Sequence, residues 1–289
     1  MRILVHLHVF YHDQVPWFLD RLRNLDGFDW DLVVTCCEAD AATESAIKAF
    51  KPDTRLLTVE NVGYDVWPFL KMLSQVDVSS YDILFKLHTK NVTSRNTVRL
   101  YGSHLRKEAW RNTLVDALLG SPDWVRNVVS VFREQPDAGM VCSGKLYGTL
   151  NFPEDGDMLT EELSALGLHT DERRFCVGNM FAIRPRLLAP LGKREFRADQ
   201  FPADSRSGSG GTLAHLYERV LSLLAPSQGY RVVAMDPPDA AFARKMRLRR
   251  ALKPVLSFIF NIDWEGNPRR KVLTILGFKI TLHENHLPD

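Results

Sequence analysis

The sequence predicts an α/β protein with a mainly parallel central sheet flanked by helices, followed by a basic C-terminal tail. Apolar runs typical of buried strands alternate with amphipathic helical segments over the first 90 residues, which is the pattern of βα repeats. The composition, 289 residues with 45% hydrophobic and 25% charged residues, is that of a globular protein with ample core. Positive charge is concentrated towards the C-terminal end, which sets the tail apart.

The first part of the chain reads as strands alternating with helices. Strands are expected over residues 2–10, 31–37, 54–59 and 82–85, and helices over residues 15–25, 41–50 and 68–76. The expected helices carry apolar residues three or four positions apart, whereas the expected strands are short apolar runs. Pro16 suits the first turn of its helix, where a proline costs no hydrogen bond.

The next part is expected to mix helices with shorter strands. Helices are expected over residues 98–119, 124–134, 159–166, 185–191 and 212–224, strands over residues 139–143, 176–184 and 230–235, and irregular segments over residues 147–175 and 199–211. Ser121 is expected to cap the 124–134 helix, with Pro122 in its first turn. Gly178 and Asn179 inside the 176–184 strand indicate a bulge or a close backbone approach.

The stretch YDILFKLHTKN, residues 81–91, carries the main functional signal. After its apolar start it presents Lys86, His88 and Lys90 at alternate positions, which a strand places on one face. Ligands of open α/β sheets bind at the carboxyl ends of strands, so we interpret these groups as binding an anion. Our hypothesis is the diphosphate of a nucleotide-sugar; the alternative is a solvated edge with ordinary surface lysines.

Two further groups of residues are candidates for donor binding. Asn61, Gly63 and Asp65 follow an expected strand, and they form either a plain turn or a site where a ribose or base approaches Gly63. His6 and His8 alternate in the first strand. They are either core residues with satisfied hydrogen bonds or contacts to a nucleobase or phosphate, and the sequence leaves both interpretations open.

The cysteines and the N-terminal stretch bear on the compartment. Cys36, Cys37, Cys142 and Cys176 show no metal-ligand spacing, so buried free thiols in a reducing cytoplasm are expected. The stretch MRILVHLHVF reads as a strand rather than a signal peptide, because two histidines interrupt it and no small-residue cleavage site follows. No run reaches the about 18 apolar residues that a membrane-spanning helix needs.

The tail is basic. Residues 240–289 carry ten Lys or Arg and four acids, a net charge of +6, which leaves −4 for the rest. Residues 241–253 read as a basic amphipathic helix and residues 255–262 as an apolar run, so an anionic membrane surface is the expected partner. The alternatives are a helix docked on the domain and nucleic-acid binding, which the lack of interleaved aromatics for base stacking makes the weakest. Residues 271–281 read as a closing strand or hairpin arm.

The order of motifs resembles the rhamnan synthesis protein F family of bacterial polysaccharide glycosyltransferases. The motifs are VHLHVFYHD, NVGYDVWPFL, YDILFKLHTKN, GSHLRKEAWRNTLVDALLGSPDWV, GNMFAIRP and GGTLAHLYERV. The resemblance covers residues 3–235 and implies a GT-A-like domain over residues 1–240, with residues 241–289 as the tail. It implies transfer of a sugar, often rhamnose, from a dTDP- or UDP-linked donor to a growing surface glycan such as O-antigen. That role implies a cytoplasmic protein, peripheral on the inner face of the bacterial plasma membrane, with a glycan or lipid-linked glycan as acceptor.

Comparison with GT-A enzymes leads to a prediction about metal. Such enzymes usually carry an Asp-x-Asp motif at this point to hold a divalent ion on the donor diphosphate, but this chain has Lys86-Leu87-His88. Lysine and histidine do not replace carboxylates as ligands of hard cations, yet they neutralise a diphosphate directly. The sequence therefore predicts metal-independent transfer.

The catalytic base is the weakest part of the assignment. The family pattern places an Asp before the Gly-Thr of the GGTLAHLYERV motif, and Gly210 stands there in this chain. The substitutes that we consider are Asp199 and Asp204 in the preceding loop and Glu218 in the helix, where Glu218 could equally form a structural ion pair. The expected acceptor contacts are Gly178, Asn179, Gly211 and His215. The missing Asp favours the alternative function, a non-catalytic glycan- or nucleotide-binding module of a polysaccharide assembly complex.

Overall fold

The structure is a computed structural model. It describes residues 1–93, 97–100, 103–149, 156–201, 212–236, 260–265 and 270–282. The chain divides into two compact units, Met1–Pro237 and Pro238–Asp289, which are described separately below.

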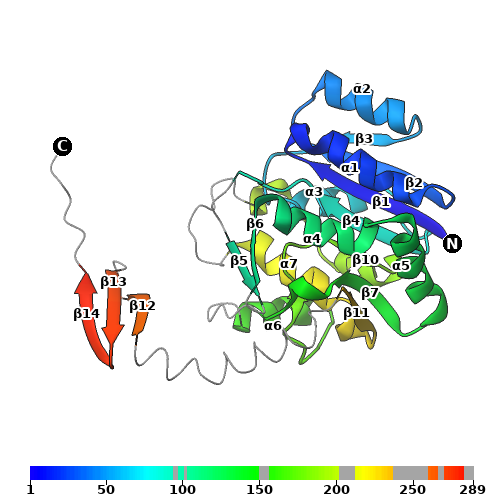
Figure 1. Cartoon of the computed structure of the whole chain (residues 1–289). Coiled ribbons are helices and arrows are strands. Elements are labelled where there is room, and N and C mark those ends of the chain that lie inside the picture. Colours follow the sequence, from blue (N-terminus) through cyan, green and yellow to red (C-terminus); the bar gives the residue numbers. More distant parts are fainter. Residues whose placement is uncertain are drawn as a thin grey trace. The chain divides into compact units, whose positions relative to one another are not determined.

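The described part of the first unit is built on a seven-stranded sheet (Figure 1). Its strands are β1 (Arg2–Val9), β2 (Asp29–Cys36), β3 (Arg55–Thr58), β4 (Ile83–His88), β7 (Ala138–Ser143), β10 (Phe181–Ile183) and β11 (Arg231–Met235). Their order is β11-β7-β10-β4-β1-β2-β3, and every neighbouring pair is parallel except that β10 runs antiparallel to β4 and β7. The predicted mainly parallel α/β sheet is thus confirmed.

Helices cover both faces of this sheet (Figure 1). The first face packs against α1 (Val15–Leu22), α2 (Ala41–Phe50), α4 (Lys107–Leu119) and α5 (Pro122–Glu134), and the second against α3 (Val66–Leu73), α6 (Gly156–Ala165) and α7 (Leu213–Leu223). Short 3-10 helices lie at His12–Gln14, Arg23–Leu25, Gly144–Leu146, Pro185–Lys193, Ala198–Gln200 and Pro226–Gln228. Ser121 caps α5 as predicted, with its side chain accepting a hydrogen bond from the Trp124 amide at 3.1 Å.

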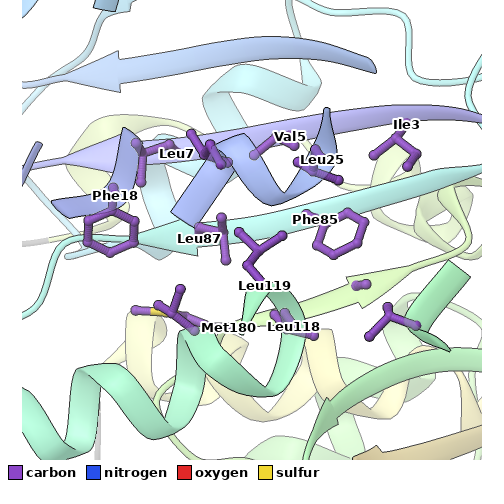
Figure 2. Packing of buried hydrophobic residues seen from close by; sticks show 14 of the residues in the cluster. Ile3, Val5, Leu7, Phe18, Leu25, Phe85, Leu87, Leu118, Leu119 and Met180 are labelled. Atoms are coloured by element: carbon purple, nitrogen blue, oxygen red, sulfur yellow. The ribbon is translucent and has the colours of Figure 1, made fainter. Parts of the chain in front are cut away.

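The two central strands differ in polarity between their faces. On the first face, Ile3, Val5 and Leu7 of β1 and Phe85 and Leu87 of β4 pack against α1 and α4 (Figure 2). The second face begins apolar but turns polar towards the carboxyl end of both strands. Strand periodicity thus places the polar residues of β1 and β4 together, facing α3 and α7.

Two predicted elements are corrected. The 98–119 helix begins only at Lys107, and its expected start forms a hairpin of β5 (Thr97–Leu100) and β6 (Ser103–Arg106). Thr97 and Val98 are β-branched and favour strands, whereas good helix formers begin at Lys107. The 176–184 strand is divided by a turn into β9 (Phe175–Cys176), which pairs with β8 (Tyr147–Gly148), and β10.

The described part of the second unit is a three-stranded antiparallel sheet of β12 (Phe260–Glu265), β13 (Arg270–Ile275) and β14 (Phe278–Leu282). The hairpin predicted at its end is confirmed, with Leu276 and Gly277 both at positive φ in the turn. The predicted basic helix at 241–253 lies outside the described residues. Within the described residues, the helices are all too short or too polar to cross a bilayer.

Candidate active site

Lys86 and His88 lie on the second face of the sheet at the carboxyl end of β4, as predicted. The strand register sets His6 beside Lys86 and His8 beside His88. The alternative of a solvated edge is wrong, because Lys86 is completely buried and His88 is only 4% exposed. A buried ammonium group requires a partner, since an isolated charge is costly to remove from water.

Asp65 supplies that partner. It is the N-cap residue of α3, yet its side chain does not cap the helix. Instead Asp65 Oδ2 accepts hydrogen bonds from Lys86 Nζ at 2.5 Å and from Asn179 Nδ2 at 2.7 Å, and it lies 3.6 Å from His88 Nδ1. The expected contact between Asp65 and a nucleoside is therefore corrected, because this carboxylate is turned into the protein to hold the charge cluster together.

Burial and neighbouring charges set the protonation states of Asp65 and His88 at neutral pH. Burial alone would raise the pKa of the Asp65 carboxyl, but the surrounding cationic groups outweigh burial and hold that pKa well below its ordinary range. Burial lowers the pKa of His88 well below its ordinary value despite the nearby carboxylate, so this imidazole is neutral at pH 7. The positive charge that balances Asp65 at neutral pH therefore belongs to Lys86 and Lys90.

The two lysines occupy different positions. Lys86 Nζ also donates to the Asn179 carbonyl oxygen at 3.0 Å, so its ammonium group is enclosed, and we assign it to holding the cluster rather than to contacting a ligand. Lys90 is half-buried, with its Nζ 4.1 Å from the ring centroid of Trp110 and 3.5 Å from His88 Nε2. Among the described residues, no carboxylate lies within ion-pair distance of Lys90. The buried Gln14 fixes its backbone, donating to the Lys90 carbonyl oxygen at 2.6 Å.

The Gly178-Asn179 turn joins the cluster to α7. Both residues have positive φ, at +97° and +57°, so the predicted bulge is a tight turn. A Cβ on Gly178 would lie 2.8 Å from Leu114 Cδ1, which explains the glycine as a close approach to α4. The Gly178 amide donates to Glu218 Oε1 at 2.9 Å, so Glu218 reaches the site but is already engaged in holding this turn.

The turn before α3 contributes an exposed aromatic residue. Gly63 has φ +63°, and a Cβ there would lie 2.8 Å from Phe201 Cδ1, so the close approach of Phe201 accounts for the glycine. Asn61 is exposed on the same turn. Tyr64, which the sequence analysis passed over, is 55% exposed, and its ring centroid lies 5.7 Å from that of His215.

The histidines of β1 are core residues. His6 Nε2 and His8 Nδ1 both hydrogen-bond the Thr35 hydroxyl, at 2.9 and 3.0 Å. Burial lowers the pKa of both imidazoles, that of His8 to about 4. Of the two interpretations left open, the structure supports core histidines, since His6 is fully buried and His8 is 4% exposed. His6 Nδ1 is nevertheless buried without a hydrogen-bond partner among the described residues.

The remaining predicted site residues differ in where they lie. His215 lies at the start of α7, where Thr212 is the cap: the Thr212 hydroxyl accepts from the His215 backbone amide at 3.4 Å and lies 2.6 Å from His215 Nδ1. Asp199 is exposed and pairs with Arg197 at 3.2 Å, outside the buried cluster. Asp204 and Gly211 fall outside the described residues. No motif in the sequence pointed to Trp110, Gln14 or Thr35, because each lies on a neighbouring element whose register the sequence does not reveal.

A cavity of about 760 Å³ in the described part of the chain lies at the opposite end of the sheet. It is lined by residues just before β4, such as Asp82, and just after β10, such as Arg184. Arg184 is engaged with the carbonyl oxygens of Ala138 and Phe132, and Arg194 with Glu162. The cavity contains none of the clustered residues, so the candidate site remains the polar carboxyl edge.

The fold and this edge define an α/β protein of the kind that binds ligands where parallel strands end. The family model for Rhamnan synthesis protein F matches residues 1–230, and the chain belongs to that family. This confirms the resemblance identified in the sequence. The protein WxcX of Xanthomonas campestris pv. campestris is 30% identical over 251 residues, which cover 80% of this chain and 32% of WxcX. The chain thus spans about a third of the length of the curated relatives it matches.

Several solved structures are similar in outline. A mannosyltransferase from Pyrobaculum calidifontis with GDP-mannose and Mn²⁺ has a TM-score of 0.38 at 18% identity, covering 89% of this chain and 62% of that one. TarS residues 1–349 of S. aureus has a TM-score of 0.42 at 10% identity, covering 82% and 59%. Glucosyl-3-phosphoglycerate synthase of Mycobacterium tuberculosis, with UDP and Mn²⁺, has a TM-score of 0.39 at 14% identity, covering 96% and 90%. At these TM-scores no residue role passes from them to this chain.

Proposed function

We propose that the unit Met1–Pro237 is a glycosyltransferase that moves a sugar, with rhamnose as the first candidate, from a dTDP- or UDP-linked donor to a growing bacterial surface polysaccharide. The observation that carries the proposal is the cluster of Lys86, neutral His88 and Lys90 at the carboxyl edge of parallel strands, where ligands of α/β sheets bind. Membership in the rhamnan synthesis family supports the polysaccharide as the destination.

The proposed division of labour follows from burial. Lys90, the half-buried lysine, faces the diphosphate and stabilises the nucleoside diphosphate as it departs, whereas His88 and Lys86 lie beneath it and Lys86 positions Asp65. Asn61 is placed to contact the nucleoside. The acceptor, a glycan or lipid-linked glycan, is assigned to the side of Asn179 and His215.

Metal independence is part of the proposal. The clustered side chains are mainly cationic, and within the described residues no group of three or more His, Cys, Asp or Glu is arranged to hold a metal ion. Lysine and neutral histidine beside a single engaged carboxylate are a poor ligand set for Mg²⁺ or Mn²⁺, which prefer several oxygen ligands. Lys90 would instead supply the positive charge that neutralises the diphosphate.

Replacing Lys90 by alanine is expected to lower kcat/KM for sugar transfer about 100-fold, the usual effect of removing one charge-stabilising donor. The assay screens dTDP- and UDP-sugars with a rhamnose oligosaccharide acceptor, in EDTA and again with added Mn²⁺. Lys71→Ala, a lysine of α3 that lines the cavity at the other end of the sheet, serves as the matched control and should keep wild-type activity. Activity that vanishes in EDTA and returns only with Mn²⁺ would show that transfer needs a metal.

One observation favours the alternative, a non-catalytic nucleotide- or glycan-binding module. The carboxylates of Asp65 and Glu218 are both engaged in hydrogen bonds inside the protein, so neither is a ready general base. Such a module would show stabilisation by a nucleotide-sugar in thermal denaturation without turnover of the donor in the same assay.

We also propose that the second unit binds the anionic inner face of the bacterial plasma membrane, which would place the protein at the membrane on the cytoplasmic side. The basic residues of 241–253 supply the charge. At the turn of the β13–β14 hairpin, Leu276 is 57% and Phe278 77% exposed, and such apolar side chains enter the headgroup region readily.

Replacing Arg249 and Arg250 by alanine is expected to weaken binding to phosphatidylserine-containing vesicles about 30-fold, because each basic residue near such a surface contributes about 1 kcal/mol. Flotation of the full chain with these vesicles measures the effect. The control removes two exposed arginines of α5, Arg126 and Arg133, and should float like the wild type. Equal flotation of all three proteins would refute this role for the tail.

A further inference from the structure

Trp110 of α4 carries a donor that lacks an acceptor. Its indole Nε1 is buried and has no hydrogen-bond partner among the described residues. Two other tryptophans follow the usual rule, with Trp67 donating to Glu60 at 2.9 Å and Trp124 to the Ala117 carbonyl oxygen at 2.7 Å. A buried N–H without an acceptor costs free energy and calls for an explanation, of which an absent ligand is one.

Gly178 packs closely against this donor. A Cβ at that position would lie 3.2 Å from Trp110 Nε1 and 2.8 Å from Leu114 Cδ1, so any other residue would cover the indole N–H or push α4 away. Gly178 itself is fixed by its hydrogen bond to Glu218. The backbone of the turn is therefore held directly beside the indole N–H.

Other polar groups of the same cluster also lack a hydrogen-bond partner, or a carboxylate within ion-pair distance, among the described residues. His88 Nδ1 and Asn179 Oδ1 are buried without hydrogen-bond partners among the described residues. Lys90 Nζ lies against the face of the Trp110 ring, 4.1 Å from its centroid, with no carboxylate in ion-pair distance within the described residues. Together an indole N–H and an ammonium group match an oxyanion, and an amide oxygen next to them matches a hydroxyl group.

We infer that Trp110 is a further binding residue of the candidate site, whose indole N–H donates to a phosphate oxygen of the diphosphate held by Lys90. This rests on the proposed function, since it assigns one more contact to the same ligand. An N–H directed at a phosphate oxygen is a charge-assisted hydrogen bond, about twice as strong as a neutral one. The donor then gains in the complex the partner that it lacks in the free protein.

Isothermal titration calorimetry with inorganic pyrophosphate tests this inference without knowledge of the sugar or the base. Trp110→Phe keeps an aromatic ring under Lys90 but removes the N–H, and it is expected to weaken pyrophosphate binding about tenfold, equivalent to about 1.4 kcal/mol. Trp124→Phe is the matched control. It removes an indole N–H that already has an acceptor outside the site, so pyrophosphate affinity should equal that of the wild type.

Thermal denaturation of the same proteins separates binding from structure. Removing a buried donor without an acceptor should leave the Tm of Trp110→Phe unchanged or raised, whereas Trp124→Phe should lower it. Wild-type affinity in Trp110→Phe, or a lowered Tm that accounts for weaker binding, would overturn the inference but leave the diphosphate site standing. Failure of the wild type to bind either pyrophosphate or UDP would overturn the diphosphate site as well.

Discussion

Replacing Asp65 by asparagine is expected to lower the free energy of unfolding by about 3–5 kcal/mol, the usual cost of removing one partner from a buried ion pair. The side chain of Lys86 is 1% exposed and that of Asp65 17%, so little water reaches the ammonium group left behind. Lys86 Nζ and Asn179 Nδ2 both donate to Oδ2, a position that the asparagine carbonyl oxygen can occupy, so the expected loss is that of the negative charge. Urea denaturation at pH 7 measures the change.

Two variants define what this loss means. The double substitution Asp65→Asn with Lys86→Met removes both charges, and it should recover much of the stability, because an apolar side chain of similar volume often replaces a buried pair without loss. Asp123→Asn breaks an exposed pair with Arg126 on α5 and should cost less than about 1 kcal/mol. A loss for Asp65→Asn as small as that of Asp123→Asn would show that the Asp65–Lys86 pair does not hold the cluster together.

The polar side chains on the second face of β4 could be predicted from the sequence, because strand periodicity is a local property. Strand periodicity places Lys86 and His88 on one side regardless of tertiary structure, and the βα pattern places them at the carboxyl edge. What periodicity does not supply is which group comes to meet them. Asp65 is 21 residues and Asn179 93 residues away from Lys86, and only the packing of α3 and of β10 brings them within hydrogen-bond distance.

The roles expected for Gly63 and Asp65 failed for the same reason. A glycine and an aspartate before a helix fit a ligand-binding turn and a structural turn equally well. The decision between them depends on Phe201, which fills the space above Gly63, and on Lys86, which draws the carboxylate inward. Trp110 is a similar case, because helical spacing identifies the buried face of its helix but not the lysine that lies on the ring.

Acid is expected to destabilise the protein well before its carboxylates titrate. His6, His8 and His88 are neutral in the folded protein, because burial lowers the pKa of each imidazole. The unfolded chain binds a proton at each of these histidines below about pH 6.5. Below that pH the unfolded state therefore binds more protons than the folded state, and stability falls as the pH falls. The contribution of Asp65 is lost separately, below about pH 4, because the folded protein holds its pKa under the ordinary value.

For His8, whose pKa is lowered to about 4, the full loss between pH 6.5 and pH 4 is about 3 kcal/mol. At pH 5 the shift of His8 alone removes about 2 kcal/mol of the about 5–15 kcal/mol that stabilises a typical domain, and His6 and His88 act in the same direction. Urea denaturation at pH 7 and pH 5, at constant ionic strength, measures the difference. In His8→Gln the loss between these two pH values should be about 2 kcal/mol smaller, whatever the substitution costs at pH 7. An unchanged loss in that variant would mean that His8 is protonated in the folded protein at pH 5, contrary to the lowering of its pKa by burial.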